Sequence, residues 1–380
     1  MRRYRNQAAV AVAALMAAAS GAAMAEDAPA KPAMSKFDEM LDSAGLTVSG
    51  YVAASYYASN GYPFNIHQFD VEHNSFQLDQ AGFQVAYQPK EGFGALVDVI
   101  AGEDARLLHL AEDGNDNSVD IRQAFIQYAT GSLTVMAGKY VTLAGAEVIN
   151  PTLNTNFSRS LLFFDSEPLT HTGVRAAYAV GEFTVYAGIN NGWNLTSTSY
   201  GSKTGEFGVS YAPASKIFAL AAYGYFGKAE AFDAEKTLVD FVGTYNVTSQ
   251  LSLVLNFDYD KQENAFTDGS DASWHAAALY VNYAINDQWR VSIRGEYLDD
   301  QDGFVTGAPQ TLKEGTVTFG YSPFKNFELR GEFRYDKSGS DTPIFYKTRE
   351  AVGAGVPDSS NLSEFALQAV YKFSSPPPAP

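Results

Sequence analysis

From residue 45 onward, hydrophobic and polar residues alternate with a period of two. In residues 327–336 the odd positions are Phe, Leu, Gly, Phe and Tyr, and the even positions are Glu, Arg, Glu, Arg and Asp. Residues 289–297 and 251–260 show the same alternation. Each stretch predicts a strand with one apolar face and one charged face. Its length of about ten residues suits a tilted strand that crosses a lipid bilayer.

The alternation predicts sixteen antiparallel strands along the chain. They fall at residues 46–57, 75–88, 93–103, 119–130, 132–140, 169–180, 182–190, 204–212, 216–227, 236–246, 250–261, 272–284, 288–299, 312–322, 326–336 and 362–373. The number is even, as single-chain bacterial outer-membrane barrels usually require.

The connections between these strands alternate in length. The short ones, such as residues 89–92 and 286–287, are rich in Gly, Pro, Asn and Ser, which favour tight turns. Between them lie longer segments, among them residues 141–168 and 337–361. Outer-membrane barrels have short periplasmic turns and long extracellular loops. The alternation therefore predicts a barrel with both termini in the periplasm.

A soluble β-sandwich is the main alternative, because its strands also alternate. Aromatic residues gather near the predicted strand ends, as at Tyr51, Trp289, Tyr297 and Phe373. Girdles at the two membrane interfaces account for this placement, which a sandwich core does not require. After residue 25 no apolar run approaches 18 residues, which excludes spanning helices. The sequence thus favours an all-β fold, a transmembrane antiparallel β-barrel.

The two ends of the chain depart from the strand pattern. Residues 1–25 combine three Arg, an Ala-rich apolar run and Ala-Met-Ala, which is typical of a secretory signal peptide. Residues 26–44 are expected to form a periplasmic lead with a short helix, and residues 374–380 a Pro-rich periplasmic tail. The barrel itself is expected to span residues 45–373. These expectations place the mature protein in the bacterial outer membrane.

Composition narrows the range of partners. Removal of the three Arg of the signal leaves 23 of the 26 basic residues against 43 acidic ones, a net charge of −20. Nucleic acid is not an expected partner, because binding its phosphates needs clustered Lys and Arg. The chain has no Cys, so disulfides cannot stabilise it in the oxidising periplasm. The expected partners are outer-membrane lipid, lipopolysaccharide and, during insertion, the barrel-assembly machinery.

Residues 141–168 contain four consecutive large apolar residues, at positions 161–164. A loop exposed to water has little reason to hold them, but a loop folded into the barrel can bury them against the wall. Irregular backbone at membrane depth is tolerated where it lines water or packs on protein. The segment is therefore predicted to be an inward-folded constriction loop. The residues predicted to narrow the pore are Glu147, Asn154, Asn156, Arg159, Asp165 and Glu167.

The charged face of the strands is predicted to line the lumen. Strand parity assigns to this face Arg175, Asp258, Arg290, Arg294, Glu296, Glu328, Arg330, Glu332 and Arg334. Further strand acids, such as Glu206, Asp240 and Asp260, give the lumen a slight acidic excess, which predicts a weak cation preference. The alternative is that cross-strand Glu/Arg pairs only neutralise one another.

Residues suited to catalysis or metal binding are few. The five His are scattered, and His67 and His73 stand six apart, which matches no common metal-ligand spacing. His171 near Ser158 or Ser160 is the one candidate pair for an outer-membrane hydrolase, and no nucleophile elbow accompanies it. The sequence therefore predicts no catalytic residue, no cofactor and no metal site. For the acidic outer loops, solvation is a simpler account than bound divalent cations.

The last predicted strand ends on an aromatic residue. Phe365, Leu367, Ala369, Tyr371 and Phe373 alternate with polar or small residues. This pattern resembles the terminal strand that the barrel-assembly machinery reads. Tyr371 and Phe373 are therefore the candidate assembly signal.

Several stretches resemble the putative β-barrel porin-2 family, the OmpL-like bacterial outer-membrane porins. They are residues 46–52 (LTVSGYV), 138–140 (GKY), 145–147 (GAE), 154–160 (NTNFSRS) and 168–175 (PLTHTGVR). The resemblance covers nearly all of the chain after residue 45, and residues 138–178 are its specific part. It implies a passive diffusion channel narrowed by residues 141–168, and porins of this size are commonly homotrimers. It names no solute, and a non-conducting structural or adhesion barrel is the alternative.

Overall fold

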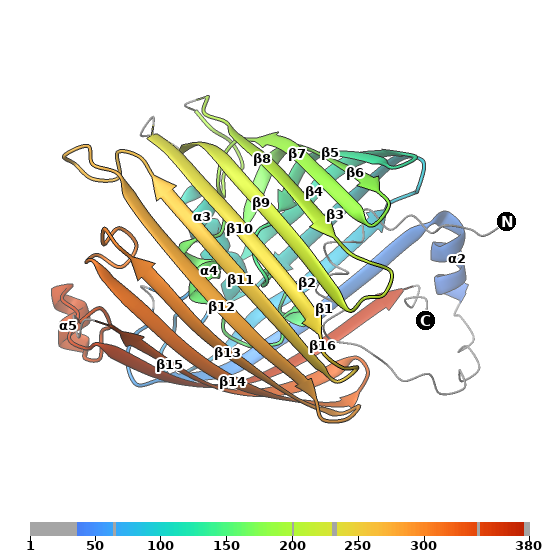
Figure 1. The fold of residues 1–380 in the computed structure, drawn as a ribbon. Helices are drawn as coiled ribbons and strands as arrows, with labels where there is room; N and C mark the ends of the chain where they lie inside the picture. Colours follow the sequence, from blue (N-terminus) through green and yellow to red (C-terminus); the bar gives the residue numbers. More distant parts are fainter. Residues whose placement is uncertain (1–35, 64–65, 200, 230–233, 340–342, 376–380) are drawn as a thin grey trace.

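Sixteen strands close into one barrel in the computed structural model, which describes residues 36–63, 66–199, 201–229, 234–339 and 343–375 (Figure 1). Each strand is antiparallel to its neighbours, and β1 pairs with β16 to close the ring. The expected signal peptide at residues 1–25 and the Pro-rich residues 376–380 lie outside the described residues.

The observed strands match the predicted ones. Their bounds are β1 Leu46–Ser59, β2 Ser75–Tyr87, β3 Gly92–Ala101, β4 Val119–Thr130, β5 Leu133–Val141, β6 Thr170–Val180, β7 Phe183–Asn190, β8 Thr204–Tyr211, β9 Phe218–Ala229, β10 Ala234–Asn246, β11 Leu251–Gln262, β12 Ala272–Ala284, β13 Trp289–Asp300, β14 Gln310–Phe324, β15 Phe327–Ser338 and β16 Asn361–Ser375. The predicted sixteen-stranded antiparallel barrel is confirmed. Differences lie at strand ends: Ser374 and Ser375, for example, extend β16 and do not belong to the tail.

The two ends of the barrel differ in the length of their connections. The short connections and helix α2 (Lys36–Ala44) lie at one end, which we call the turn end. The long connections start from the other end, the loop end, and contain the helices α3 (Glu103–Asp113), α4 (Leu161–Asp165) and α5 (Arg349–Ala354). Of these helices, the sequence pattern predicted only α2. None of the described helices is both long enough and apolar enough to cross a membrane.

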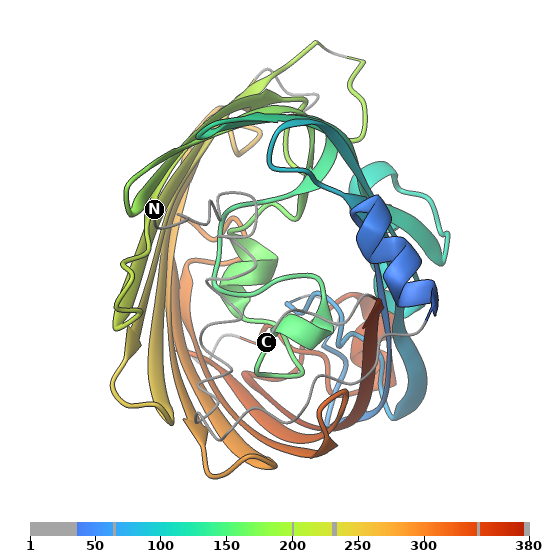
Figure 2. The same ribbon diagram turned by 90° about the vertical axis from the view of Figure 1, so that its right-hand side faces the viewer.

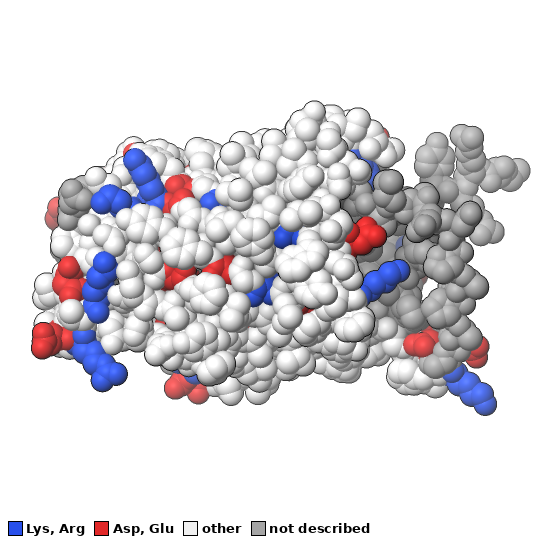
Figure 3. All heavy atoms as spheres, turned by 90° about the horizontal axis from the view of Figure 1, so that it is seen from below, with Lys and Arg blue, Asp and Glu red and all other residues white. Residues whose placement is uncertain are grey.

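The outer surface of the barrel is apolar over its middle. In β13, Ile293 and Tyr297 are exposed, whereas Arg294 and Glu296 on the opposite face are buried. Figure 3 shows one side of the barrel, where uncharged atoms dominate the middle and charged side chains gather toward the loop end. Apolar side chains thus face outward and charged ones inward. This arrangement suits contact with lipid.

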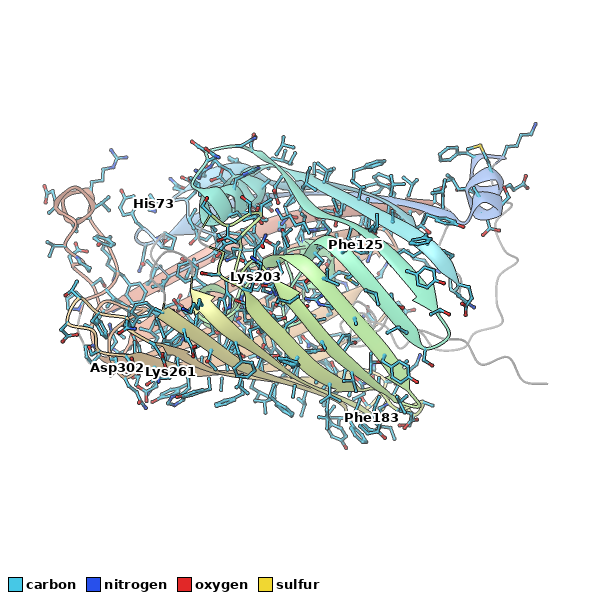
Figure 4. All side chains as sticks on the ribbon, turned by 90° about the horizontal axis from the view of Figure 1, so that it is seen from above. His73, Phe125, Phe183, Lys203, Lys261 and Asp302 are labelled. Carbon is cyan, nitrogen blue, oxygen red and sulfur yellow. The ribbon has the colours of Figure 1, made fainter. Side chains whose placement is uncertain are left out.

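Aromatic pairs form a belt near the turn end. Trp289 stacks on Tyr321 with ring centroids 4.5 Å apart, and the rings of Phe183 and Tyr211 are 4.6 Å apart. Figure 4 shows Phe183 at the turn end, whereas Lys261 lies at the loop end. Because aromatic rings favour the headgroup level of a bilayer, these pairs mark one membrane interface.

The barrel closes where β16 meets β1. Phe373 stands opposite Gly50, and Tyr371 stands opposite Val52. A Cβ atom on Gly50 would lie 2.6 Å from Cζ of Phe373, so the ring covers the glycine and leaves no room for a side chain there. The side chains of Tyr371 and Phe373 are about half exposed. The two candidate assembly residues therefore lie on the outer face, beside the closing seam.

Candidate functional site

The connection between β5 and β6, residues 142–169, lies inside the ring of strands when the barrel is viewed from the turn end (Figure 2). We call this segment the inner loop. It contains a 3-10 turn (Pro151–Leu153) and the short helix α4. A hydrogen bond from the Thr142 N–H to the Leu169 carbonyl (3.1 Å) closes its base. The inner loop is thus a large excursion from two adjacent points on the wall.

Two polar side chains tie the inner loop to itself. Asn154 accepts a hydrogen bond from Val148 N (2.9 Å) and donates one to Val148 O (2.6 Å). The buried Arg159 donates to the carbonyls of Val148 (3.0 Å), Ile149 (3.0 Å) and Phe157 (2.7 Å). Burial lowers the pKa of Arg159, although a guanidinium keeps its charge at neutral pH. Both residues, predicted to narrow the pore, hold the shape of the loop.

Helix α4 carries the apolar run of the inner loop. The Ser160 hydroxyl caps the helix by accepting a hydrogen bond from Phe163 N (3.1 Å). Leu161 and Leu162 are fully buried and join a cluster that includes Leu298 on β13. The Phe163 ring lies in a second buried cluster. Each such side chain removed from water contributes about 2 kcal/mol, so the run holds α4 against the inside of the wall.

Four Arg of β13 and β15 bind backbone carbonyls of the inner loop. The donor–acceptor distances are 2.7 Å for Arg290 to Thr155 O, 2.9 Å for Arg294 to Ser158 O, 3.0 Å for Arg330 to Pro151 O and 2.7 Å for Arg334 to Arg159 O. Parity predicted that these guanidinium groups face lumen water. They do point into the barrel, but the loop covers three of them: Arg294, Arg330 and Arg334 are at most 4% exposed.

Acidic and amide side chains of the wall bind the N–H groups of the same loop. Glu332 accepts from Phe157 N (2.6 Å) and Ser158 N (2.9 Å), and Glu296 accepts from Leu161 N (2.7 Å). Another wall contact joins the side chain of Asn156 to the hydroxyl of Thr318 on β14 (2.6 Å). The charged wall thus replaces the hydrogen bonds that irregular backbone would otherwise make to water.

Arg294 is the centre of this anchoring network. Its fully buried guanidinium lies 2.9 Å from Glu147, 2.7 Å from Glu296 and 3.4 Å from Glu314. Glu147 comes from the loop and also accepts a hydrogen bond from Ser160 N (2.6 Å). One cation therefore links the loop to two strands, and its removal would leave several buried carboxylates without compensation.

The remaining predicted residues are distributed over other contacts. Arg175 pairs with Glu206 (2.8 Å) on the wall near the loop base, and both are buried. Arg290 and Glu328 form a partly exposed pair (2.6 Å). Glu167 and Asp258 are buried, and Asp165 is partly buried. Burial, reinforced by Asp300 for Asp165 and by Asp240 for Glu167, raises the pKa of both loop acids well above their ordinary values.

The hydrolase pair suggested by the sequence is not assembled among the described residues. His171 is fully buried, bonds Gly192 O through Nδ1 (3.1 Å) and stacks on Tyr225 with centroids 5.0 Å apart. The Ser158 hydroxyl accepts a hydrogen bond from Arg294 (3.0 Å). The Ser160 hydroxyl caps helix α4. Both hydroxyls thus serve the anchoring of the loop.

A cavity of about 70 Å³ lies between the inner loop and the wall formed by β9 to β12. The loop contributes Glu147 and Asn154 to its lining, and the wall contributes Tyr223, Val242 and Tyr280. The loop also bonds the wall on this side, because Gly145 N donates to Asp240 (3.2 Å) and Ala146 N donates to Asn256 (2.7 Å). The cavity lies beside these contacts.

The connection between β1 and β2 is held by a second buried ionic cluster. His67 lies 2.9 Å from Asp70, 3.3 Å from Glu364 and 3.5 Å from Asp336, and Arg334 pairs with Asp336 at 2.8 Å. Burial and Arg334 lower the pKa of His67, but the three carboxylates outweigh them and raise it to about 10. His67 is therefore charged at neutral pH and fixes this connection to β15 and β16.

We expect His67→Gln to destabilise the barrel most at low pH. A group whose pKa is raised on folding adds stability that is fully present below its unfolded pKa, near 6.5, and is lost as pH rises through about 10. The substitution should lower the free energy of unfolding by on the order of 3 kcal/mol at pH 6, and this loss should shrink toward pH 10. Urea unfolding of both proteins across this range measures it, with the exposed His73→Gln as control. An equal cost at pH 6 and pH 10 would contradict the assignment.

Solved structures share this architecture. The anion-selective porin from Comamonas acidovorans has a TM-score of 0.62 at 11% identity, covering 86% of this chain and 99% of that one. The outer-membrane channel DcaP of Acinetobacter baumannii has a TM-score of 0.59 at 14% sequence identity, and the match covers 90% of this chain and 99% of that one. OmpT of Vibrio cholerae, in a trimer form, has a TM-score of 0.59 at 14% sequence identity, and the match covers 86% of this chain and 99% of that one. At these identities the likeness shows the fold. No curated protein sequence matches this chain significantly.

A sixteen-stranded antiparallel barrel with an apolar exterior and a charged interior is the architecture of bacterial outer-membrane barrels. The model of the family described as "Putative beta-barrel porin-2, OmpL-like" matches residues 45–373. The chain belongs to this family, as the resemblance of its motifs implied.

Proposed function

We propose that the protein is a passive diffusion channel for small hydrophilic solutes or ions, narrowed by the inner loop. A sixteen-stranded barrel is wide enough to leave an aqueous lumen. The observation that carries the proposal is the anchoring of residues 142–169 across the interior by Arg290, Arg294, Arg330 and Arg334. A segment held this firmly obstructs part of the cross-section permanently, so solutes pass beside it.

A weak preference for cations belongs to the same proposal. Among the described residues, buried acids outnumber buried Lys and Arg by more than two to one. Fixed negative charge inside a narrow lumen raises the local concentration of cations. The many Arg–carboxylate pairs reduce this effect, which is why we expect the preference to be weak.

Single-channel recording in planar bilayers tests both parts. We expect stepwise currents and, in asymmetric KCl, a reversal potential of cationic sign. A reversal potential of anionic sign would contradict the selectivity. A complete absence of steps from correctly folded protein would reject the channel and favour a structural or adhesion barrel.

We also propose that the protein assembles as a homotrimer. β7 and β8 have eight residues each, fewer than the about nine to eleven that a tilted strand needs to cross a bilayer. Their outer faces expose Val185, Ile189 and Phe207, so a neighbouring subunit would shield a wall too short for lipid. The OmpT trimer form shares the fold. Light scattering of the detergent-solubilised protein should give three times the chain mass, and a single-chain mass would contradict it.

For Phe373 we propose a role in assembly, after export with removal of residues 1–25. Phe373→Ala should lower the yield of folded barrel in the outer membrane several-fold, because the terminal aromatic residue would be missing when the strand is recognised. Phe365→Ala is the matched control, since Phe365 is similarly exposed on the same strand. Refolding of both variants in detergent should be comparable. Equal yields of the two variants in cells would rule out a special role for Phe373.

A further inference from the structure

Three buried carboxylates meet at the base of the inner loop. Asp240 on β10 and Asp258 on β11 are register partners, so their side chains face each other across the ladder. Glu167, near the end of the inner loop, is the third. One oxygen of each lies within 4.8 Å of the others, and the three residues are at most 5% exposed. Like charges directly opposite one another destabilise paired strands, so this arrangement requires a compensating interaction.

The hydrogen-bond donors around the cluster do not provide that compensation. Gly145 N (3.2 Å) and Asn256 Nδ2 (2.9 Å) donate to one oxygen of Asp240, and Asn256 also donates to one oxygen of Asp258 (3.2 Å). Among the described residues, no N–H or hydroxyl group donates to the other oxygen of either Asp or to Glu167, and the two Asp side chains have only each other within hydrogen-bonding range there. Buried carboxylates normally pair with donors, cations or metal ions. Glu167, buried and unpartnered, points into the Asp240–Asp258 pair from a different part of the chain.

The course of the inner loop brings Glu167 to this place. Gly145, at the start of the loop, has φ +88°, and a Cβ atom there would collide with the Glu167 carboxylate. The beginning and the end of the loop therefore converge on the same point of β10 and β11. Asp260, two residues beyond Asp258 on the same face of β11, is also fully buried, and it has Ser166 and Lys236 as partners.

We propose that Glu167, Asp240 and Asp258 bind a Ca²⁺ ion that fastens the base of the inner loop to β10 and β11. Ca²⁺ takes oxygen ligands at about 2.3–2.6 Å in flexible geometry, so its ligand oxygens stand up to about 5 Å apart. The separation of the three carboxylates fits this requirement. Mg²⁺ demands near-ideal octahedral geometry at shorter distances, which suits three side chains from separate segments less well. The site extends the anchoring by Arg, on β13 and β15, to the opposite side of the loop.

Calcium binding can be measured on the whole protein, independently of channel activity. Protein refolded in detergent free of lipopolysaccharide and treated with chelator is dialysed against CaCl₂. We expect one tightly bound Ca²⁺ per chain and a higher unfolding temperature with Ca²⁺ than with chelator. Asp258→Asn should weaken binding at least about tenfold, because the number of charged ligands falls. Asp268→Asn, which changes an exposed loop acid, should leave binding unchanged.

The Asp258→Asn variant has a second expected signature. Without Ca²⁺ it should unfold at a higher temperature than the wild type, because the repulsion between facing carboxylates is relieved. With Ca²⁺ the order should reverse. If the variant does not fold, Glu167→Gln gives the same comparison and leaves the β10–β11 ladder intact.

Two results would overturn the proposal. One is wild-type protein that binds no more Ca²⁺ than Asp258→Asn. The other is an unfolding temperature that responds neither to Ca²⁺ nor to chelator. The carboxylates would then be compensated by shared protons. A channel that conducts but fails both measurements rejects the calcium site alone.

Discussion

Removal of residues 144–167 should raise the single-channel conductance about threefold or more, because the loop that crosses the lumen would be absent. Thr142 and Leu169 already meet through a backbone hydrogen bond, so two Gly can join Leu143 to Pro168 with little strain. All sixteen strands remain. The deletion would uncover Arg and Glu side chains of the wall that the loop now buries, and lumen water would solvate them. Recording in planar bilayers measures the change.

The control for this deletion removes an exposed loop of the same barrel. Residues 264–270 connect β11 to β12 at the loop end and are mostly exposed. Their replacement by two Gly should leave the conductance within experimental error of the wild type. An unchanged conductance in the 144–167 deletion, with the barrel folded, would show that the inner loop does not limit the pore.

Arg294→Met is expected to cause the largest loss of stability of any single substitution in the wall. The guanidinium is fully buried among Glu147, Glu296 and Glu314, and it also binds the Ser158 carbonyl. Removing one member of a buried ionic network leaves its partners uncompensated, which costs about 3–5 kcal/mol. The free energy of unfolding in urea should fall by this amount. Because the loop loses its central contact, channel currents should also become noisier.

Arg349→Met is the matched control for that substitution. Arg349 is exposed at the start of α5, so its substitution should change the free energy of unfolding by no more than about 0.5 kcal/mol. If Arg294→Met costs as little as this control, the ionic network does not hold the loop.

The barrel itself could be predicted because its determinants are local. Alternation in residues 289–300 specifies which face of β13 meets lipid, and neighbours in sequence are neighbours in the sheet. The β-bulges and the exact strand ends escaped prediction. At the register shift between Asp98 and Val99, for example, β4 holds an extra residue, and its buried positions change from Asp120 and Arg122 to Phe125 and Gln127.

The inner loop could be predicted in part. The apolar run at residues 161–164 signalled a segment that needs a protein surface to pack on, and its first three residues are buried. Parity placed Arg290, Arg294, Arg330 and Arg334 inside the barrel. It could not show that they bind loop carbonyls 135 to 179 residues away, because no local pattern encodes such a partner.

For the carboxylate cluster, sequence parity placed Asp240 and Asp258 on the lumen face and Glu167 in the loop, but it could not show that the three side chains meet. The sequence predicted no metal site, since Asp240, Asp258 and Glu167 have no common ligand spacing. Their meeting depends on the β10–β11 register and on the return of the loop past Gly145.

The sequence by itself determined the class of fold, the number of strands and which face of each strand meets lipid. These properties follow from periodicity and turn chemistry, which act over a few residues. Tertiary structure alone decided which part of the wall the inner loop packs against and which charges hold it. Those contacts join segments far apart in the chain, and they exist only after the closed barrel has brought its wall around the loop.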